Sequence, residues 1–307
     1  MLSDIGPLYR LGVKLFSPEE TAALLPYPEL AQSLERVLRD KTVQAPERLV
    51  MGLPGGGALL LMPAADDEIT VVKQVTVHPN RQPSVQAEVY IMDTRTGERK
   101  LALDGSIVTA RRTAAVSLLA AQKLAPNPDG ALLIVGAGTQ AKSHLEAFQT
   151  SLGTKKVYIA ARNLERAANL QTYAQALGME AKIVNAEDVR EEVSLVVTAT
   201  TSRTPVLPSK VRDDVFIAAV GAYRPDMAEI PAELVRRCRV FVDTLEGAKA
   251  EAGDLIQAGG DWGEVRPLEQ VLDSPRPSSG PVLFKSVGHA LWDLAAARLA
   301  VSKAMSS

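Results

Sequence analysis

Cysteine and histidine are scarce in this sequence. Its 307 residues contain one cysteine, Cys238, which excludes a disulfide within the chain and a metal centre built from cysteines. The three histidines, His78, His144 and His289, do not show the spacing of a metal-ligand pair, and we expect each to be structural or exposed. We therefore predict no metal site, and the single cysteine fits a reducing compartment.

Long apolar runs and an excess of one charge are also missing. No stretch reaches membrane-spanning length, and residues 1–10 lack the apolar segment of a secretory signal. The formal net charge is -2, which gives no reason to expect nucleic acid or an anionic membrane as a partner. The G-x-S-x-G pattern of a hydrolase nucleophile is absent as well. We expect a cytoplasmic protein with no nucleic-acid and no membrane partner.

The length and composition that are present fit two globular domains. Hydrophobic residues make up 46% of the chain and charged residues 23%. Residues 1–47 are typical of two helices, the first starting at a capping box over residues 17–20 (SPEE) and the second near Pro28. We then predict a mostly antiparallel sheet with strands over residues 48–53, 58–62, 69–77, 86–92 and 101–103. A helix over residues 107–124 follows.

After residue 125, strands and helices alternate. We predict strands over residues 131–135, 156–160, 181–184, 195–199, 215–220 and 240–242, and the clearest helix over residues 164–177. This alternation is typical of the α/β class, with a doubly wound parallel sheet of the Rossmann type. We expect a mixed α+β domain over residues 1–125, a Rossmann domain over residues 126–288, and a helix over residues 289–307 that completes the first domain.

The stretch ALLIVGAGTQA, residues 131–141, organises the second half. An apolar run that ends at glycine predicts a strand buried on both faces, and the turn after it fits the dinucleotide fingerprint G-x-G-x-x-G/A. Gly136 would make the tight turn, Gly138 would let the backbone approach a pyrophosphate, and Ala141 would let the helix pack closely. The alternative is an ordinary tight turn, because such glycine spacings also arise by chance.

The end of the second predicted strand bears on the choice of nicotinamide cofactor. NAD-binding sheets usually place a carboxylate there to hold the ribose 2′-OH, whereas this chain has Arg162 and Asn163. A guanidinium suits a 2′-phosphate, so we predict NADP(H), with NAD(H) as the alternative. Arg162 could equally be a surface residue at a helix start. Residues 198–202 (TATTS) either line the cofactor cleft or form an ordinary loop.

Several cations occur in apolar surroundings. Arg48 opens a strand, Lys73 lies within VVKQV, and Arg111 and Arg112 interrupt a helix of small apolar residues. If they converge beside the cofactor, they predict a site for a carboxylate or phosphate ligand. A lysine in a strand is more often simply solvent-facing.

The acidic residues give weaker signals. We expect Asp66, Asp67 and Glu68 to be solvated turn charges. Glu251 and Asp254, within AKAEAGD, are expected to be exposed or at a helix end.

Taken together, these stretches resemble the ornithine cyclodeaminase/mu-crystallin family. The matching segments are VVKQVTVHP, TARRTAAVS, LLIVGAGTQAKSH, VGAYRPDMAEI, VDTLEGAKAEAGD and LFKSVGHALWDLAAARL, which follow the family order from about residue 48 to residue 300. The resemblance implies a homodimer in which a substrate-binding and dimerisation domain is joined to a Rossmann domain. It also implies oxidoreductase chemistry on small amino or imino acids.

The resemblance further implies roles for individual residues. Arg48, Lys73 and Arg112 match the cations that hold the substrate carboxylate, with Lys73 nearest the reacting carbon–nitrogen bond. The positions that match the cofactor site are Thr139 and Gln140 at the pyrophosphate turn, Arg162 and Asn163 at the adenosine phosphate, Thr200 and Val220 along the cleft, and Ser84 and Ser286 near the nicotinamide.

One departure from the family pattern guides the functional hypothesis. In cyclodeaminases the stretch after the fifth strand reads GGD, and its aspartate is the acid/base; here Tyr223 takes that place, with Asp226 three residues later. A tyrosine is a poor base at neutral pH. We therefore predict NAD(P)H-dependent reduction of cyclic ketimine carboxylates, Δ1-pyrroline-2-carboxylate to L-proline and Δ1-piperideine-2-carboxylate to L-pipecolate, with Arg224 completing the pocket.

Three other functions stay open at this point. The chain could be an ornithine cyclodeaminase, or a dehydrogenase that makes alanine or an N-substituted amino acid. It could also be a crystallin-like protein that binds a ligand without catalysis. The complete glycine turn, Lys73 and Arg112 argue against lost chemistry.

Overall fold

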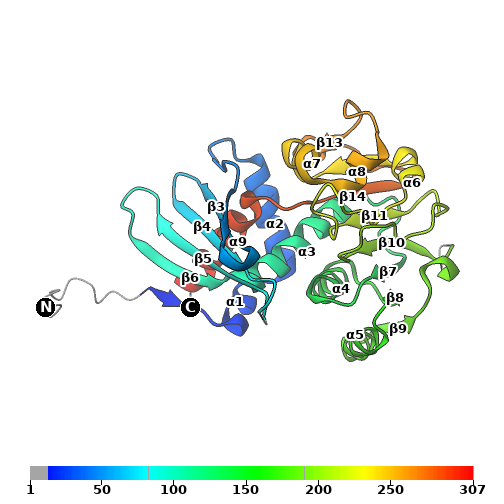
Figure 1. The fold of residues 1–307 in the computed structure, drawn as a ribbon, viewed down its shortest axis with the longest axis horizontal. Coiled ribbons are helices and arrows are strands. Elements are labelled where there is room, and N and C mark those ends of the chain that lie inside the picture. The colour runs from blue at the N-terminus through cyan, green and yellow to red at the C-terminus, as the bar shows by residue number, and fades with distance from the viewer. Residues whose placement is uncertain (1–12, 82, 190, 307) are drawn as a thin grey trace, which may run out of the picture.

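The computed structural model describes residues 13–306 except residues 82 and 190, and it contains two β-sheets linked by a long helix (Figure 1). The expectation about a secretory signal concerns residues 1–10, which lie outside this description. No helix in the described part of the chain is long and apolar enough to cross a membrane.

The first sheet is built mainly from antiparallel neighbours. Its strands are β1 (Lys14–Leu15), β2 (Leu49–Leu53), β3 (Gly57–Ala65), β4 (Ile69–Val77), β5 (Val85–Asp93) and β6 (Arg99–Asp104). They lie in the order β1-β6-β5-β4-β3-β2, with β2 to β6 antiparallel and β1 parallel to β6. Strand β1 was not predicted, because a strand of two residues is too short to show an alternation of apolar and polar side chains.

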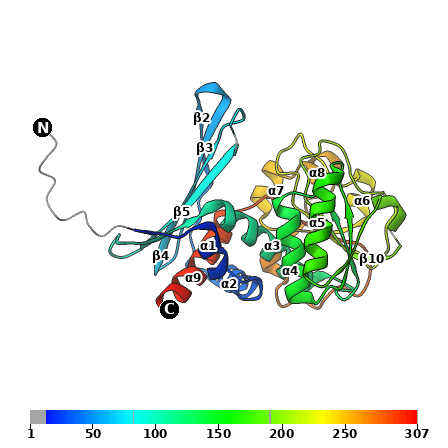
Figure 2. The ribbon, with the colours of Figure 1, turned by 90° about the horizontal axis from the view of Figure 1, so that it is seen from below.

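Helices cover one side of this sheet (Figure 2). They are α1 (Pro18–Leu24), α2 (Tyr27–Arg39), α3 (Gly105–Leu124) and α9 (Ala290–Ser306). The predicted capping box of α1 is present: the Ser17 hydroxyl accepts from the Glu20 N–H at 3.2 Å, and the Glu20 carboxylate accepts from the Ser17 N–H at 2.8 Å.

Helix α9 returns from the far end of the chain and packs on α2, β3 and β4. Its Arg298 forms ion pairs with Asp40 and Asp66, both at 2.5 Å. The expectation that Asp66 is a solvated turn residue is therefore wrong, because its carboxylate is buried under α9. The predicted division of the chain into domains at residues 125 and 288 stays a prediction.

The second sheet is parallel and confirms the predicted α/β class. Its strands are β7 (Ala131–Val135), β8 (Lys156–Ala160), β9 (Glu180–Ile183), β10 (Val193–Thr198), β11 (Phe216–Ala219), β12 (Arg239–Val242), β13 (Arg266–Pro267) and β14 (Val282–Lys285). Their order is β13-β12-β14-β11-β10-β7-β8-β9. The prediction missed β14, which lies centrally between β11 and β12, because four residues ending in a lysine carry little strand signal.

Helices flank this sheet on both faces (Figure 1). Helices α4 (Thr139–Leu152) and α5 (Leu164–Ala176) share one face with α3, and α6 (Ala232–Arg237), α7 (Leu245–Glu251) and α8 (Gly253–Ala258) cover the other. Alternate strand residues accordingly belong to two separate apolar clusters.

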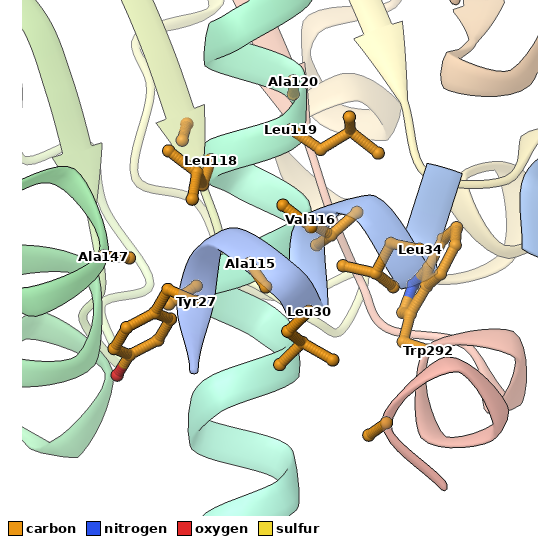
Figure 3. Close-up of a cluster of buried hydrophobic side chains, with 14 of the residues drawn as sticks. Tyr27, Leu30, Leu34, Ala115, Val116, Leu118, Leu119, Ala120, Ala147 and Trp292 are labelled. Carbon is orange, nitrogen blue, oxygen red and sulfur yellow. The ribbon is translucent and has the colours of Figure 1, made fainter. Parts of the chain in front are cut away.

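A single apolar cluster runs through both sheets by way of α3. In Figure 3, α3 contributes Val116 and Leu119 between the second sheet and α2, which contributes Leu30 and Leu34. Trp292 of α9 closes the same cluster. Because α3 is buried along most of its length, it fixes the first sheet relative to the second.

Candidate active site

The glycine turn joins β7 to α4. Gly136 has φ 121°, a backbone region that favours glycine, and its N–H donates to the Ala160 carbonyl at 2.8 Å. A Cβ atom at Gly136 would lie 2.5 Å from the carbonyl oxygen of Ala199. Glycine is therefore required here both by the turn and by the adjoining strand end.

The start of α4 fits a pyrophosphate. Gly138 is the N-cap residue, no side chain caps the helix, and the space where its Cβ would lie is open. Thr139 is exposed, while Ala141 is fully buried against the sheet. The first N–H groups of a helix lack backbone partners and carry the positive end of its dipole. The turn therefore offers an accessible anion site of the kind a dinucleotide uses.

At the end of β8, the two residues assigned to the adenosine phosphate differ in their contacts. The Asn163 side chain accepts from the Arg166 N–H at 2.9 Å and so caps α5. Arg162 is exposed, and no side chain in the described part of the chain pairs with its guanidinium. Arg162 is therefore free to bind an anion, whereas Asn163 already has a structural role.

A buried carboxylate that the sequence prediction overlooked joins two strand ends of the cleft. Glu229 accepts from the Thr198 hydroxyl at 2.9 Å and from the Thr200 N–H and hydroxyl at 2.7 and 2.9 Å. It also accepts from the N–H groups of Gly221 at 2.7 Å and Ala222 at 3.2 Å. Glu229 therefore holds together the segments that follow β10 and β11, where the resemblance placed Thr200 and Val220.

A second buried carboxylate, that of Asp254, contacts the backbone at Glu229. Asp254 accepts from the N–H groups of Glu229 and Ile230 at 2.6 and 2.9 Å, and it forms an ion pair with Lys285 of β14 at 2.8 Å. Asp254 lies in the first turn of α8, at a helix end as expected, but it is buried rather than exposed because its carboxylate pairs with Lys285. Burial raises the pKa of Glu229, and the charge of Lys285 opposes that rise.

The predicted cations do converge, around a carboxylate from the C-terminal helix. Lys73 of β4 is 2% exposed, and its ammonium lies 2.9 Å from Asp293 of α9, which is fully buried. The Nε of Arg112 lies 3.5 Å from the same carboxylate. Burial lowers the pKa of Lys73 to about 8; the Asp293 charge opposes this, and the Arg112 and Arg48 charges reinforce it.

Arg48, the third cation, lies where the first sheet meets the second. One nitrogen of Arg48 donates to Glu251 at the end of α7 at 3.0 Å and to the Gly288 carbonyl at 3.2 Å. A Cβ atom at Gly288, where φ is 85°, would lie 3.0 Å from the Arg112 guanidinium. Glu251 lies at a helix end, one of the two expected positions, but it is half-buried because it pairs with Arg48.

The loop that connects β14 to α9 is held by one carboxylate. Asp243, directly after β12, accepts from the Ser286 hydroxyl at 2.8 Å and from the N–H groups of Val287 and Gly288 at 2.9 and 2.8 Å. His289 follows, and burial lowers its pKa while the Asp243 charge opposes that shift. Ser286 thus lies in the site, but its hydroxyl proton is committed to Asp243.

Other predicted residues are placed as follows. Arg111 points away from the cations: its Nε donates to the Leu25 carbonyl at 2.7 Å and its guanidinium stacks on Tyr27. Arg224 is exposed and donates to Asp226 at 2.9 and 2.8 Å. Arg224 therefore has a surface partner, unlike the three cations around Asp293 and Glu251.

The remaining cofactor candidates lie on loops and strand ends. Ser84 is half-buried and its carbonyl accepts from the His78 N–H at 2.7 Å; the Val220 N–H donates to the Thr198 carbonyl at 3.0 Å. The Gln140 amide lies 3.4 Å from the carbonyl of Thr109, whose hydroxyl lies 3.5 Å from the Lys73 ammonium. Thr109 of α3 therefore lies between the glycine turn and the Lys73 ammonium.

Three carboxylates of the site, Asp293, Asp243 and Glu229, were not predicted, although two of them carry a usable signal in the sequence. Asp293 is the one acidic residue within the apolar stretch ALWDLAAARLA, and Asp243 follows directly after a buried strand, the position where parallel sheets place functional groups. In the described part of the chain, no group of three or more histidine, cysteine or acidic side chains could hold a metal ion.

Comparison with known proteins identifies the family. The sequence model of the ornithine cyclodeaminase/mu-crystallin family matches residues 18–307. The chain belongs to this family. The resemblance drawn from the sequence motifs is therefore confirmed.

Relatives of this family member match along nearly the whole chain. It is 39% identical over 293 residues to Delta(1)-pyrroline-2-carboxylate reductase 1 of Burkholderia multivorans, covering 93% of this chain and 94% of the relative. It is 39% identical over 295 residues to the Delta(1)-pyrroline-2-carboxylate/Delta(1)-piperideine-2-carboxylate reductase of Azospirillum brasilense, covering 94% and 95%.

A solved structure has the same fold. Delta(1)-pyrroline-2-carboxylate reductase of Thermococcus litoralis, in complex with NADH and L-proline, superposes with a TM-score of 0.88 at 29% identity, covering 96% of this chain and 98% of the other.

Proposed function

We propose that this protein reduces cyclic ketimine carboxylates with NAD(P)H, converting Δ1-pyrroline-2-carboxylate to L-proline and Δ1-piperideine-2-carboxylate to L-pipecolate. The observation that carries the proposal is the convergence of Lys73, Arg112 and Arg48 beside the glycine turn, a group of cations suited to a small carboxylate. The names of the 39% identical relatives support the same reaction.

The residues of the site would act mainly by positioning the substrate. Arg112 and Arg48 bind the carboxylate, and Lys73, with a pKa of about 8, contributes a third positive charge and can exchange a proton near the ring nitrogen. A bound nicotinamide supplies the hydride. A protonated cyclic imine already has an electrophilic carbon, so Tyr223, which is exposed, need not replace the cyclodeaminase aspartate.

The cofactor preference follows from the second strand of the Rossmann-type sheet. Thr139, Gln140 and the two glycines of the turn would hold the pyrophosphate, with Thr200, Val220, Ser84 and Ser286 along the nicotinamide side. We infer a preference for NADP(H) over NAD(H), because Arg162 is an exposed cation, without an ion-pair partner among the described residues, where NAD-selective sheets have a carboxylate. NADH would remain a substrate, since the pyrophosphate turn does not depend on the 2′ position.

We infer a cytoplasmic homodimer formed through the first sheet. The edge strand β2 exposes Leu49, Val50 and Met51, and β5 exposes Val85 and Tyr90. Exposed apolar residues on an edge strand favour association with another chain. The molecular mass of the particle in solution tests this part of the proposal.

The deciding experiment is oxidation of NADPH and NADH with each of the two cyclic imines, run beside a test for ammonia release from ornithine. Rapid cofactor oxidation with an imine and no ammonia is the expected result. Ammonia and proline formed from ornithine would instead establish a cyclodeaminase. If neither imine is reduced, the proposal is wrong, and 2-oxo acids with amines become the next substrates to measure.

A further inference from the structure

Around the three cations assigned to the substrate, the candidate site contains as many acidic as basic side chains. The cations are Lys73, Arg112 and Arg48, and the carboxylates that contact them or the adjoining loop are Asp293, Asp243 and Glu251. A site with balanced charge disfavours a ligand with net charge, because burying an uncompensated charge costs free energy. A cyclic ketimine carboxylate that is protonated at nitrogen has no net charge, whereas a 2-oxo acid carries one negative charge.

Two of these carboxylates are buried and paired within the protein. Asp293 lies 3.0 and 2.9 Å from the Lys73 ammonium through its two oxygens. Asp243 accepts three hydrogen bonds through one oxygen, and its other oxygen accepts from the Thr244 N–H at 2.9 Å. Neither carboxylate is exposed. Both groups are held by contacts within the protein: Asp293 pairs with Lys73 and Arg112, and Asp243 binds the loop after β14.

Glu251 differs from both. Its side chain is 29% exposed, one oxygen pairs with Arg48 at 3.0 Å, and the other oxygen accepts no hydrogen bond from any described residue. Burial raises the pKa of Glu251, and the Arg48 charge opposes that rise. Glu251 therefore has an accepting oxygen available beside one of the cations assigned to the substrate carboxylate.

We propose that Glu251 accepts a hydrogen bond from the protonated ring nitrogen of the substrate and thereby selects cyclic iminium carboxylates over ligands without an N–H. This inference rests on the proposed function. The nitrogen and the carboxylate are attached to the same carbon of the substrate. The carboxyl carbon is thus two bonds from the nitrogen, so a substrate whose carboxylate contacts Arg48 can direct its N–H toward Glu251, the partner of Arg48.

The contact persists through the reaction. Hydride adds to the ring carbon, the π-electron pair of the C=N bond moves to nitrogen, and the secondary amine then takes one proton from water. The product has an ammonium group in place of the iminium, so Glu251 keeps a cationic N–H partner. For a 2-oxo acid, the carbonyl oxygen would instead face the Glu251 carboxylate, and two acceptors repel each other.

The test uses two product-like ligands that differ in one ring atom: L-proline, which carries an NH2+ group, and (S)-tetrahydrofuran-2-carboxylate, which has an ether oxygen there. Their inhibition constants against imine reduction are measured for the wild type and for Glu251→Gln. We expect the wild type to bind L-proline about tenfold or more tightly, as a charge-assisted hydrogen bond implies. In Glu251→Gln we expect most of that preference to be lost, with the KM for the reduced cofactor unchanged.

Glu246→Gln is the matched control, because Glu246 is exposed in the first turn of the same helix. It should keep the wild-type ratio of the two constants. Glu251→Asp retains the charge and should regain part of the preference, which separates recognition of the N–H from an effect on folding.

The outcomes separate this inference from the proposed function. If the wild type reduces an imine but Glu251→Gln still prefers L-proline as strongly, the role of Glu251 is wrong and the reductase function stands. If the wild type binds both ring ligands equally, the inference is also overturned. If the wild type reduces neither imine, the proposed function fails first.

Discussion

The Lys73 ammonium and the Asp293 carboxylate lie 2.9 Å apart although 220 residues separate them in the chain. Lys73 comes from the middle of β4 and Asp293 from the first turn of α9, and both are buried. Burial makes the charged form of a lysine costly, and a neighbouring carboxylate offsets that cost. The C-terminal helix therefore supplies the charge that favours the protonated form of Lys73, against the effect of burial.

The first prediction concerns this pair and pH. Lys73 has a pKa of about 8, so kcat/KM for the imine should fall as the pH rises above that value and the positive charge is lost. Asp293→Asn removes the charge that favours the protonated lysine, so the alkaline fall should move to lower pH. Asp273→Asn, a change in an exposed surface carboxylate, is the control. The substrate ionises in the same way with every variant, so it cannot cause a difference between them. A pH profile of kcat/KM that is the same in Asp293→Asn and the wild type would therefore contradict an effect of Asp293 on Lys73.

Two adjacent arginines provide a second test. Arg112→Ala should lower kcat/KM for the imine by about ten- to hundredfold, the effect of losing about 1.5–3 kcal/mol of charge-assisted binding. The KM for NAD(P)H should stay the same. Arg111→Ala removes the neighbouring guanidinium, which packs on Tyr27, and should lower thermal stability without this selective loss. Equal kinetic effects in the two variants would remove Arg112 from the substrate site.

Cofactor choice gives a third test. Arg162→Asp should reverse the preference from NADPH toward NADH, because a carboxylate repels the 2′-phosphate and can accept from the ribose 2′-OH. Steady-state kcat/KM with each cofactor measures the ratio. Arg95→Asp makes the same charge change in the exposed turn between β5 and β6 and should leave the ratio alone. A ratio unchanged by Arg162→Asp would mean that the guanidinium does not contact the phosphate.

The fourth prediction concerns the buried carboxylate at the strand ends. Glu229→Gln replaces an accepting oxygen by an NH2 group, so at least one of the donors from Thr198, Thr200 or Gly221 loses its partner. We expect the free energy of unfolding to fall by about 3 kcal/mol, and the KM for NAD(P)H to rise severalfold while the inhibition constant of L-proline changes little. Glu233→Gln, at an exposed position of α6, is the control. Wild-type stability and cofactor KM in Glu229→Gln would contradict this role.

The fifth prediction concerns acid stability. His144 is fully buried, its ring nitrogens contact the Gln140 carbonyl and the Ser117 hydroxyl, and burial lowers its pKa from 6.5 to about 4. Between these values the unfolded chain binds a proton that the folded chain does not, so stability falls as the pH is lowered. The full contribution is about 3 kcal/mol. His144→Gln should show a shallower fall between pH 6.5 and 4 in denaturant unfolding, and an identical slope would contradict it.

Local patterns predicted much of the fold because the forces behind them are local. The capping box at Ser17 depends on residues within one turn, and the strand before Gly136 is an apolar run bounded by a turn. The glycine itself is required by its own φ angle. The predicted α/β class, the antiparallel first sheet and the convergent cations were all readable from such stretches or from the family motifs.

The residues whose contacts were not predicted have long-range partners. Asp254, Glu251 and Asp66 look like ordinary surface charges in sequence, but each forms an ion pair with a residue far along the chain: Lys285, Arg48 and Arg298 respectively. Strand β14 is equally hard to recognise, because its four residues become a strand through pairing with β11 and β12. Neither the long-range ion pairs nor this strand pairing can be predicted from residues nearby in the sequence.

By itself, the sequence determined the family, the cofactor turn and the identity of the cations. Only the tertiary structure decided which carboxylates face those cations and that Glu229 joins two strand ends. The physical reason is that backbone conformation and apolar burial are set largely by residues close in sequence, whereas the pairing of buried charges is set by the packing of α9, α7 and α8 against distant strands.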